Sequence, residues 1–138
     1  MATVRLLRDD ELCEEARAVF ADIRATRKTD TVNDFWRALA NDPATLRRTW
    51  ESIKQVMAPG ALDPLTKELL YVAVSMAHGC DYCIHSHTAA ARAKGMSEAQ
   101  FMELVAVVGM AAETNRLVAA LGVPVDAAFR EPPAKPAD

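Results

Sequence analysis

The stretch that decides the fold reads Glu68-Leu-Leu-Tyr-Val-Ala-Val-Ser-Met-Ala-His-Gly-Cys80-Asp-Tyr-Cys83-Ile-His85-Ser-His87. It holds two of the three cysteines of the chain and all three of its histidines. An acidic residue opens an apolar run, and Gly79 interrupts the chain just before the first cysteine. We predict the end of one helix, a tight turn at Gly79 and the start of a second helix.

Cys80, Cys83 and His87 share one face of this predicted second helix. At about 100° per residue, the three positions fall within about 60° of one another. His85 lies two residues beyond Cys83, at about 200°, on the opposite side of the helix. The spacing therefore selects His87, and not His85, as the partner of the thiols.

The position of the thiols at a helix start suggests what this face can do. The thiolate is the nucleophile, and the unpaired N–H groups of a helix N-terminus lower thiol pKa values. His87, one turn beyond Cys83, can take a proton from it directly or through a water. The face thus offers an activated nucleophile, a base and a second thiol in Cys80. Periodicity alone places Glu68 in an exposed first turn.

The pattern Glu68, then Cys80-x-x-Cys83-x-x-x-His87, with Gly95 closing the helix, resembles the alkylhydroperoxidase D (AhpD)-like group. That group belongs to the carboxymuconolactone decarboxylase superfamily, and the resemblance covers roughly residues 42–122. It implies a dithiol that reduces peroxides or exchanges disulfides. It also implies that Glu68 is shielded, near His87, and forms a proton relay with it.

Helix spacing and the resemblance together give each candidate residue an expected role. Cys83 attacks a hydroperoxide or a disulfide, Cys80 resolves the product, and His87 takes the proton with support from Glu68. A dithiol partner, such as a thioredoxin-like or lipoyl protein, must reduce the disulfide again, and no organic cofactor or metal is implied. The family forms homotrimers or homohexamers, and the apolar last helices suit burial against another subunit.

Tyr82 and His85 are the supporting candidates. The best-studied members of the group carry a histidine immediately before the second cysteine, where this chain has Tyr82. The relay is therefore expected to be shorter or weaker here. Tyr82 is expected beside the thiols or at a subunit interface, and His85 on the helix surface or at an interface. His78 is expected at a helix end, where a cation suits the dipole.

Length and composition restrict the other possibilities. The chain has 138 residues, 51% of them hydrophobic, which predicts one domain with a sizeable core. A net charge of −3 gives no electrostatic case for nucleic acid or an anionic membrane. We find no apolar run of membrane-span length and no signal peptide, so we expect a cytoplasmic protein. Three cysteines do not form a structural disulfide framework there.

Hydrophobic periodicity predicts an all-α fold of about six helices in antiparallel hairpins, with no strand. Residues 1–122 should form a single helical domain around the 42–122 motif region, followed by a Pro-rich tail at 123–138. The helix that begins at Pro64 is apolar almost all round, so it should be the central buried helix. Cys13 is expected to be a buried, inert thiol. The first helix is expected to run to about residue 28, with Asp9 or Asp10 as its N-cap. The other helices are expected over residues 32–40, 43–57, 64–78, 81–94 and 97–121.

Three other functions remain open for the central motif. Cys80, Cys83, His87 and Glu68 offer four ligands for zinc, although no second CxxC pair supplies the usual separate segment. A decarboxylase like the superfamily's namesake acts on a lactone carboxylate and does not use a dithiol. A non-enzymatic helical oligomer could instead sense oxidants through its thiols.

Overall fold

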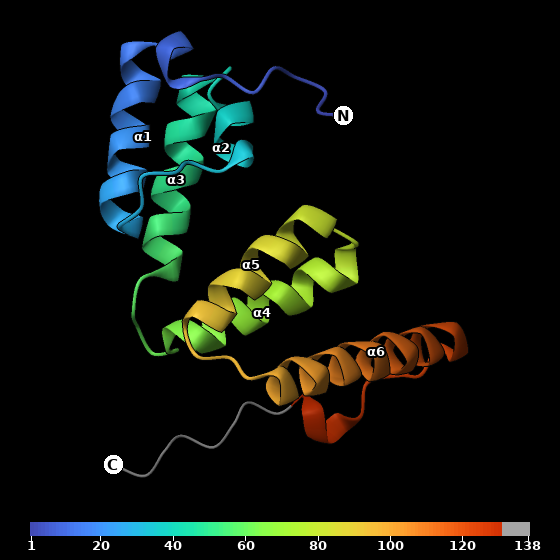
Figure 1. The fold of residues 1–138 in the computed structure, drawn as a ribbon. Helices are drawn as coiled ribbons and strands as arrows, with labels where there is room; N and C mark the ends of the chain where they lie inside the picture. The colour runs from blue at the N-terminus through green and yellow to red at the C-terminus, as the bar shows by residue number, and fades with distance from the viewer. Residues whose placement is uncertain (131–138) are drawn as a thin grey trace, which may run out of the picture. The chain divides into compact units, whose positions relative to one another are not determined.

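The computed structural model describes residues 1–130, and every regular element in that range is helical (Figure 1). The predicted all-α fold of about six helices is confirmed. The elements are η1 (Asp9–Glu11), α1 (Glu14–Arg27), α2 (Asp34–Leu39), α3 (Pro43–Met57), α4 (Pro64–His78), α5 (Asp81–Ala93), α6 (Glu98–Leu121) and η2 (Ala127–Phe129).

The chain divides into two compact units, residues 1–60 and the residues from 61 onward. The first unit contains α1, α2 and α3, and its buried residues form one apolar cluster. Trp36 and Trp50 meet edge to face at its centre, with ring centroids 5.5 Å apart. The single domain over residues 1–122 stays a prediction.

The start of α1 differs from the prediction. Asp9 does not cap this helix; it pairs with Arg24 and Arg37, and the chain makes a short 3₁₀ turn before α1 begins at Glu14. Cys13 is the N-cap, and its sulfur accepts a hydrogen bond from the Ala16 N–H. Cys13 is exposed, so the prediction of a buried thiol is wrong. Its position outside the first helical turn leaves it beyond the buried stripe of α1.

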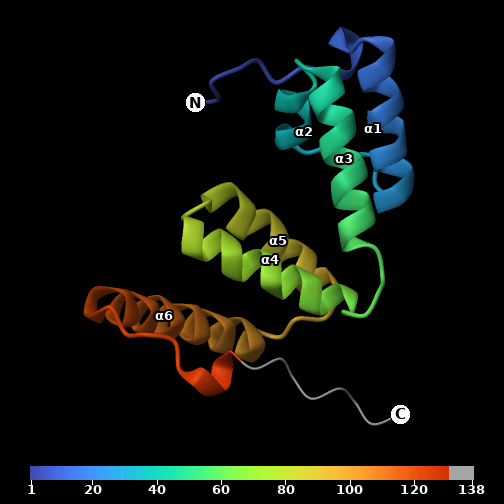
Figure 2. The same cartoon turned by 180° about the vertical axis from the view of Figure 1, so that it is seen from behind.

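The second unit begins with an antiparallel hairpin of α4 and α5, which lie side by side in both views (Figures 1 and 2). Asp63 caps α4 by accepting a hydrogen bond from the Thr66 N–H at 3.0 Å, with Pro64 in the first helical position. Gly79 ends α4 in the left-handed conformation, with φ of 67°. The hairpin brings the beginning of α4 beside the end of α5.

Burial on α4 is one-sided, which corrects the prediction of a central buried helix. Glu68, Val72 and Ser75 are its buried residues, whereas Leu70 and Val74 are 51% and 57% exposed. Within its unit α4 packs against α5 and α6, and Leu70 and Val74 lie on the side of the helix opposite its buried residues. The face that the apolar sequence predicts to be buried is therefore open in the single chain.

α6 is the longest helix, with 24 residues, and none of them is buried. Ser97 and Gln100 form the predicted capping box, and Gly122 ends the helix with φ of 59°. By length and composition alone α6 is long and apolar enough to cross a membrane, whereas the sequence analysis found no apolar run of that length.

The predicted tail at 123–138 is described only in part. Residues 123–130 follow α6 and contain the short η2 turn, and they are exposed. Residues 131–138, which hold three of the prolines of that prediction, lie outside the described residues.

Candidate active site

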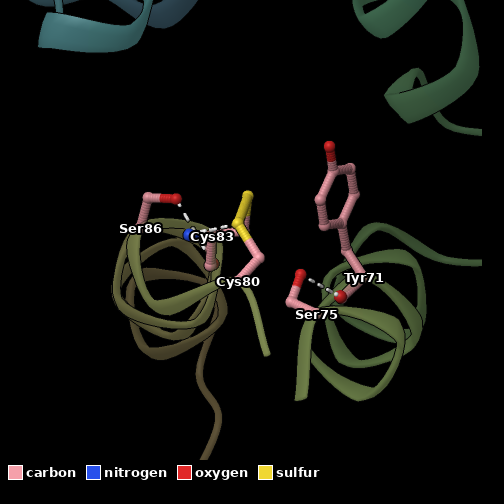
Figure 3. Close-up of a disulfide and its surroundings, with 5 residues drawn as sticks. All are labelled: Tyr71, Ser75, Cys80, Cys83 and Ser86. Atoms are coloured by element: carbon pink, nitrogen blue, oxygen red, sulfur yellow. Dashed lines mark hydrogen bonds between the residues drawn. A yellow bond between two sulfur atoms is a disulfide. The ribbon is translucent and has the colours of Figure 1, made fainter. Parts of the chain in front are cut away.

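Cys80 and Cys83 form a disulfide at the start of α5 (Figure 3). Cys80 is the N-cap residue, and its sulfur accepts a hydrogen bond from the Cys83 N–H at 3.3 Å. The Cα atoms are 5.3 Å apart, within the usual range for a disulfide. The pair therefore lies where the N–H groups of the first turn stabilise a thiolate after reduction.

His87 and Glu68 face each other across the hairpin. Nδ1 of His87 lies 2.8 Å from Oε2 of Glu68, and the two side chains are 19% and 7% exposed. The predicted proximity of a shielded Glu68 to His87 is confirmed, and its exposed first-turn alternative is wrong. An ionised carboxylate only accepts hydrogen bonds, so Nδ1 carries the proton in the neutral ring, and Nε2 is left as the acceptor.

The second oxygen of Glu68 binds a lysine that the sequence analysis did not select. Nζ of Lys94 lies 2.8 Å from Oε1. Burial raises the pKa of Glu68, but the hydrogen bonds and charges of His87 and Lys94 together outweigh it and leave the pKa below its usual range. The carboxylate is therefore ionised at neutral pH and shared between an imidazole and an ammonium.

Tyr71 was also missed. Its ring stacks on the His87 ring, with centroids 3.5 Å apart and planes inclined by 16°. Figure 3 shows the Tyr71 ring on α4 across from the disulfide of α5. Ser75, on the next turn, donates to the Tyr71 carbonyl at 2.7 Å. Stacking holds the imidazole in one plane, and the contact of Nδ1 with Glu68 sets the orientation of the ring within that plane.

Helical spacing could have placed both missed residues among the candidates but could not have selected them. Lys94 follows His87 by seven residues, two turns along the same face of α5. Tyr71 follows Glu68 by three residues on α4. The hairpin pairs these two stripes, so residues of either stripe near the Glu68–His87 contact were candidates. What the sequence lacked was the register in which α4 and α5 pair.

The supporting candidates lie outside this cluster. His85 is on the exposed side of α5 and pairs with Asp81 at 3.6 Å, with side chains 82% and 92% exposed. Tyr82 is 46% exposed on the first turn of α5. His78 is the last residue of α4, as predicted, and is exposed. The structure thus joins Glu68 and His87 on the side of α5 that faces α4, and leaves His85 in solvent.

The same cluster does not form a metal site. Within residues 1–130 no group of three or more histidine, cysteine or acidic side chains is arranged to hold a metal ion. The two cysteine sulfurs are bonded to each other, and both Glu68 oxygens are engaged by His87 and Lys94. Of the chemistries proposed from the sequence, this geometry fits the dithiol.

An all-helical hairpin with a CxxC disulfide at a helix start and a histidine–glutamate pair on the adjoining face defines a class of helical dithiol proteins. The family model described as the carboxymuconolactone decarboxylase family matches residues 43–126. The chain therefore belongs to the carboxymuconolactone decarboxylase family, and the match agrees closely with the predicted 42–122. The resemblance to its AhpD-like group is confirmed by the relatives.

Two curated proteins are similar to this chain. An uncharacterized protein 4 in the cox locus of Paracoccus denitrificans is 37% identical over 86 residues, which cover 62% of this chain and 74% of that protein. The alkyl hydroperoxide reductase AhpD of Solibacter usitatus is 32% identical over 127 residues, 87% of this chain and 70% of that protein.

A crystal structure shows the same fold at higher identity. The alkylhydroperoxidase AhpD core from Rhodospirillum rubrum superposes with a TM-score of 0.93 and is 61% identical. The match covers 96% of this chain and 99% of that chain. It therefore includes both units of the present chain, beyond the part that the family model matches.

Proposed function

We propose that this protein is an AhpD-like thiol peroxidase, which reduces hydroperoxides through Cys80 and Cys83 and is recharged by a dithiol. The observation that carries the proposal is the disulfide at the start of α5, with the Glu68–His87 pair on the adjoining face. The relatives from Solibacter usitatus and Rhodospirillum rubrum, both described as AhpD proteins, support it.

The first step begins from the reduced pair. His87 lies one turn beyond Cys83 and two turns beyond Cys80, so its free Nε2 is better placed to take the Cys83 proton, directly or through a water. The Cys83 thiolate attacks one peroxide oxygen of ROOH, an S–O bond forms and the O–O bond breaks. The leaving alkoxide takes the proton from His87, which produces ROH and a Cys83 sulfenic acid.

The second step restores the observed disulfide. The Cys80 sulfur attacks the sulfenic sulfur, and its proton and the hydroxide leave together as water. A dithiol partner then exchanges with the disulfide, leaves as its own disulfide and returns both cysteines to thiols. The net reaction converts one ROOH and one dithiol into ROH, water and one disulfide. Thioredoxin-like and lipoyl proteins are the proposed partners.

Steady-state turnover tests this function. Reduced protein is mixed with cumene hydroperoxide and dihydrolipoamide, and oxidation of the dithiol is followed by recycling with lipoamide dehydrogenase and NADH. We expect many peroxides consumed per protein molecule. Consumption of a single equivalent, with no turnover under any dithiol, would instead identify a thiol sensor. Decarboxylation of a lactone carboxylate with the Cys83→Ser protein would support the namesake activity.

We also propose that the protein assembles as a homotrimer or homohexamer in the cytoplasm, where dithiols are kept reduced. The support is the apolar surface of α6, where Val107, Met110 and Leu121 are 65%, 61% and 76% exposed. Monomeric proteins rarely leave so long an apolar face uncovered. Light scattering at micromolar concentration should give three or six times the 15.0 kDa chain mass, and a monomer mass would defeat this proposal.

A further inference from the structure

Lys94 occupies a specific place at the far end of the site. It is the C-cap residue of α5, and the next residue, Gly95, turns the chain away with φ of 96°. The antiparallel hairpin sets this helix end beside Glu68, in the second turn of α4. A cation also suits the carbonyl end of the α5 dipole. Lys94 is therefore held between a helix end and a buried carboxylate.

The contact with Glu68 is unlike the surface ion pairs of this chain. The Glu68 side chain is 7% exposed and that of Lys94 is 38% exposed, so the lysine closes the solvent side of a buried carboxylate. The other carboxylate oxygen is already bound to Nδ1 of His87. A carboxylate in such a place needs partners for both oxygens, because an unpaired buried charge is costly.

We propose that Lys94 is a positioning residue of the thiol site, whose ammonium holds Glu68 ionised and turned toward His87. Lys94 acts through the carboxylate and does not touch the reacting sulfur. It binds Oε1, which leaves Oε2 free for Nδ1, and Nδ1 in turn sets which nitrogen of His87 faces away from Glu68. The inference rests on the proposed function, since it assigns a role within the same proton relay.

The other charged groups around Glu68 do not duplicate this role. From α5, His87 and Lys94 hydrogen-bond to the carboxylate. From α6, which also packs against α4, the charged residues are all exposed to solvent; they are Glu98, Glu103, Glu113 and Arg116. Lys67 precedes Glu68 on α4 and stays unchanged in every variant below.

Loss of the Lys94 charge is expected to shift the pH profile of thiol reactivity. The Lys94 ammonium is one of the groups that lower the pKa of Glu68, so without Lys94 that pKa should rise. Glu68 then takes up its proton at a higher pH, and a neutral carboxyl no longer supports His87 as it receives the thiol proton. The acid limb of thiol reactivity should therefore move to higher pH, and the rate on that limb should fall about tenfold.

The experiment measures thiol reactivity without peroxide. Dithiothreitol-reduced protein reacts with 2,2′-dipyridyl disulfide, which traps thiolates at acid pH, from pH 3.5 to 8, and mass spectrometry identifies the Cys83 adduct. Lys94→Met should show the shifted limb, and its rate should converge with that of the unchanged protein near pH 8. Lys94→Arg should restore most of the shift, because it keeps the charge.

Arg92→Met is the matched control. Arg92 is also in the last turn of α5, but it pairs with Glu98 at 3.0 Å on the exposed side. The Arg92→Met substitution also removes one positive charge from the end of α5, but it should leave the acid limb of the thiol-reactivity profile unchanged. An equal shift in Arg92→Met would overturn the proposal, and so would a uniform loss at all pH values in Lys94→Met.

The two proposals fail in different ways. If the protein does not turn over peroxide, the thiolate-trapping profile still reports on Lys94. If Lys94→Met keeps the acid limb of the unchanged protein while peroxide turnover persists, the peroxidase stands and the role of Lys94 is refuted. Should Lys94→Met not fold, as judged by circular dichroism, Lys94→Gln provides the same comparison.

Discussion

The two units of this chain distribute their apolar residues in opposite ways. In residues 1–60 every buried residue is apolar, and Phe20, Ile23 and Leu46 are fully enclosed. Among the described residues of the second unit, the buried set is divided equally between apolar Val72, Ala91 and Met96 and polar Glu68, Ser75 and Thr88. That unit exposes large apolar side chains along α4 and α6 instead.

The difference indicates a division of labour. The first unit buries its apolar residues in its own core, and such burial is the main favourable contribution to the free energy of folding. The second unit places polar groups between α4 and α5, where low polarity strengthens their electrostatic interactions. Its exposed apolar surface is the one on which the proposed assembly rests. The first unit should therefore respond to mutation through stability, and the second through chemistry and assembly.

The largest effect is expected at the two cysteines of the second unit, where the proposed reaction takes place. Cys83→Ser should abolish peroxide consumption, because the attacking sulfur is lost, and Cys80 should stay unlabelled by a dimedone-type probe. Cys80→Ser should retain the first step and trap a sulfenic acid at Cys83, visible by mass spectrometry after labelling. If Cys80 were instead oxidised at the native rate in Cys83→Ser, the two roles would have to be exchanged.

The next largest effect should fall on the stability of the first unit. Trp36 is 2% exposed, and Trp36→Ala should lower the free energy of unfolding by about 3–5 kcal/mol, a large part of the usual total. Both tryptophans lie in this unit, so Trp50 fluorescence follows its unfolding in denaturant, while circular dichroism follows the whole chain.

Leu117→Ala on α6 is the matched control for the core substitution. Leu117 is 53% exposed, so its loss should cost less than about 0.5 kcal/mol in the single chain. Any larger cost should depend on protein concentration, because it would come from assembly. A concentration-independent loss as large as that of Trp36→Ala would erase the contrast between the units.

The contrast between the units also describes what the sequence could predict. Asp42-Pro43, Asp63-Pro64 and Ser97 with Gln100 are local signals, and the helices start where these signals predict. The start of α1 was missed because its Asp9 is engaged by Arg24 and Arg37, residues remote in sequence. Local chemistry determines helix ends only where no distant partner competes.

For the candidate site, too, the sequence predicted the local arrangement but not the contacts between helices. Cys80, Cys83 and His87 share one helix, so spacing alone places them on one face. Glu68 required the family resemblance, since its periodicity places it in solvent. Predicting the contact of Lys94 with Glu68 would have required the register in which α4 and α5 pair. The apolar pattern of α4 was misleading, because periodicity cannot tell burial within a chain from burial between chains.

A smaller effect is expected from changing the charge of Glu68. Glu68→Gln keeps an acceptor for Nδ1 but removes the carboxylate, so peroxide turnover should fall by about 10–100-fold, less than for the loss of Cys83. Glu103→Gln on the exposed side of α6 is the control and should leave turnover unchanged. Equal turnover in Glu68→Gln and the unchanged protein would remove Glu68 from the relay.

The same variant has a signature in stability against pH. The pKa of Glu68 is lower in the folded chain than its ordinary value of 4.5. Its ionised form therefore contributes stability that is fully present above the unfolded pKa and is lost as pH falls through the folded pKa. Glu68→Gln should remove this acid-side loss, so denaturant midpoints measured between pH 3 and 6 should vary less with pH than in Glu103→Gln.

The smallest effect is expected at the buried hydroxyl of Thr88. Its Oγ1 is buried and has no hydrogen-bond partner among residues 1–130, although Thr88 directly follows His87. Replacing an unsatisfied buried hydroxyl by a methyl group of similar shape is close to neutral or stabilising, so Thr88→Val should change the unfolding free energy by no more than about +1 kcal/mol.

Ser75→Ala provides the comparison for this last prediction. Ser75 is also buried in the second unit, but its hydroxyl donates to the Tyr71 carbonyl at 2.7 Å. Losing that satisfied hydrogen bond should lower the free energy of unfolding by about 0.5–1.5 kcal/mol. Ser75→Ala should therefore lower the denaturant midpoint, whereas Thr88→Val should raise it or leave it unchanged. If Thr88→Val cost as much as Ser75→Ala, the Thr88 hydroxyl would have to bind a group beyond the described chain, such as a water or the peroxide. The polar interior of the second unit would then extend one residue past His87.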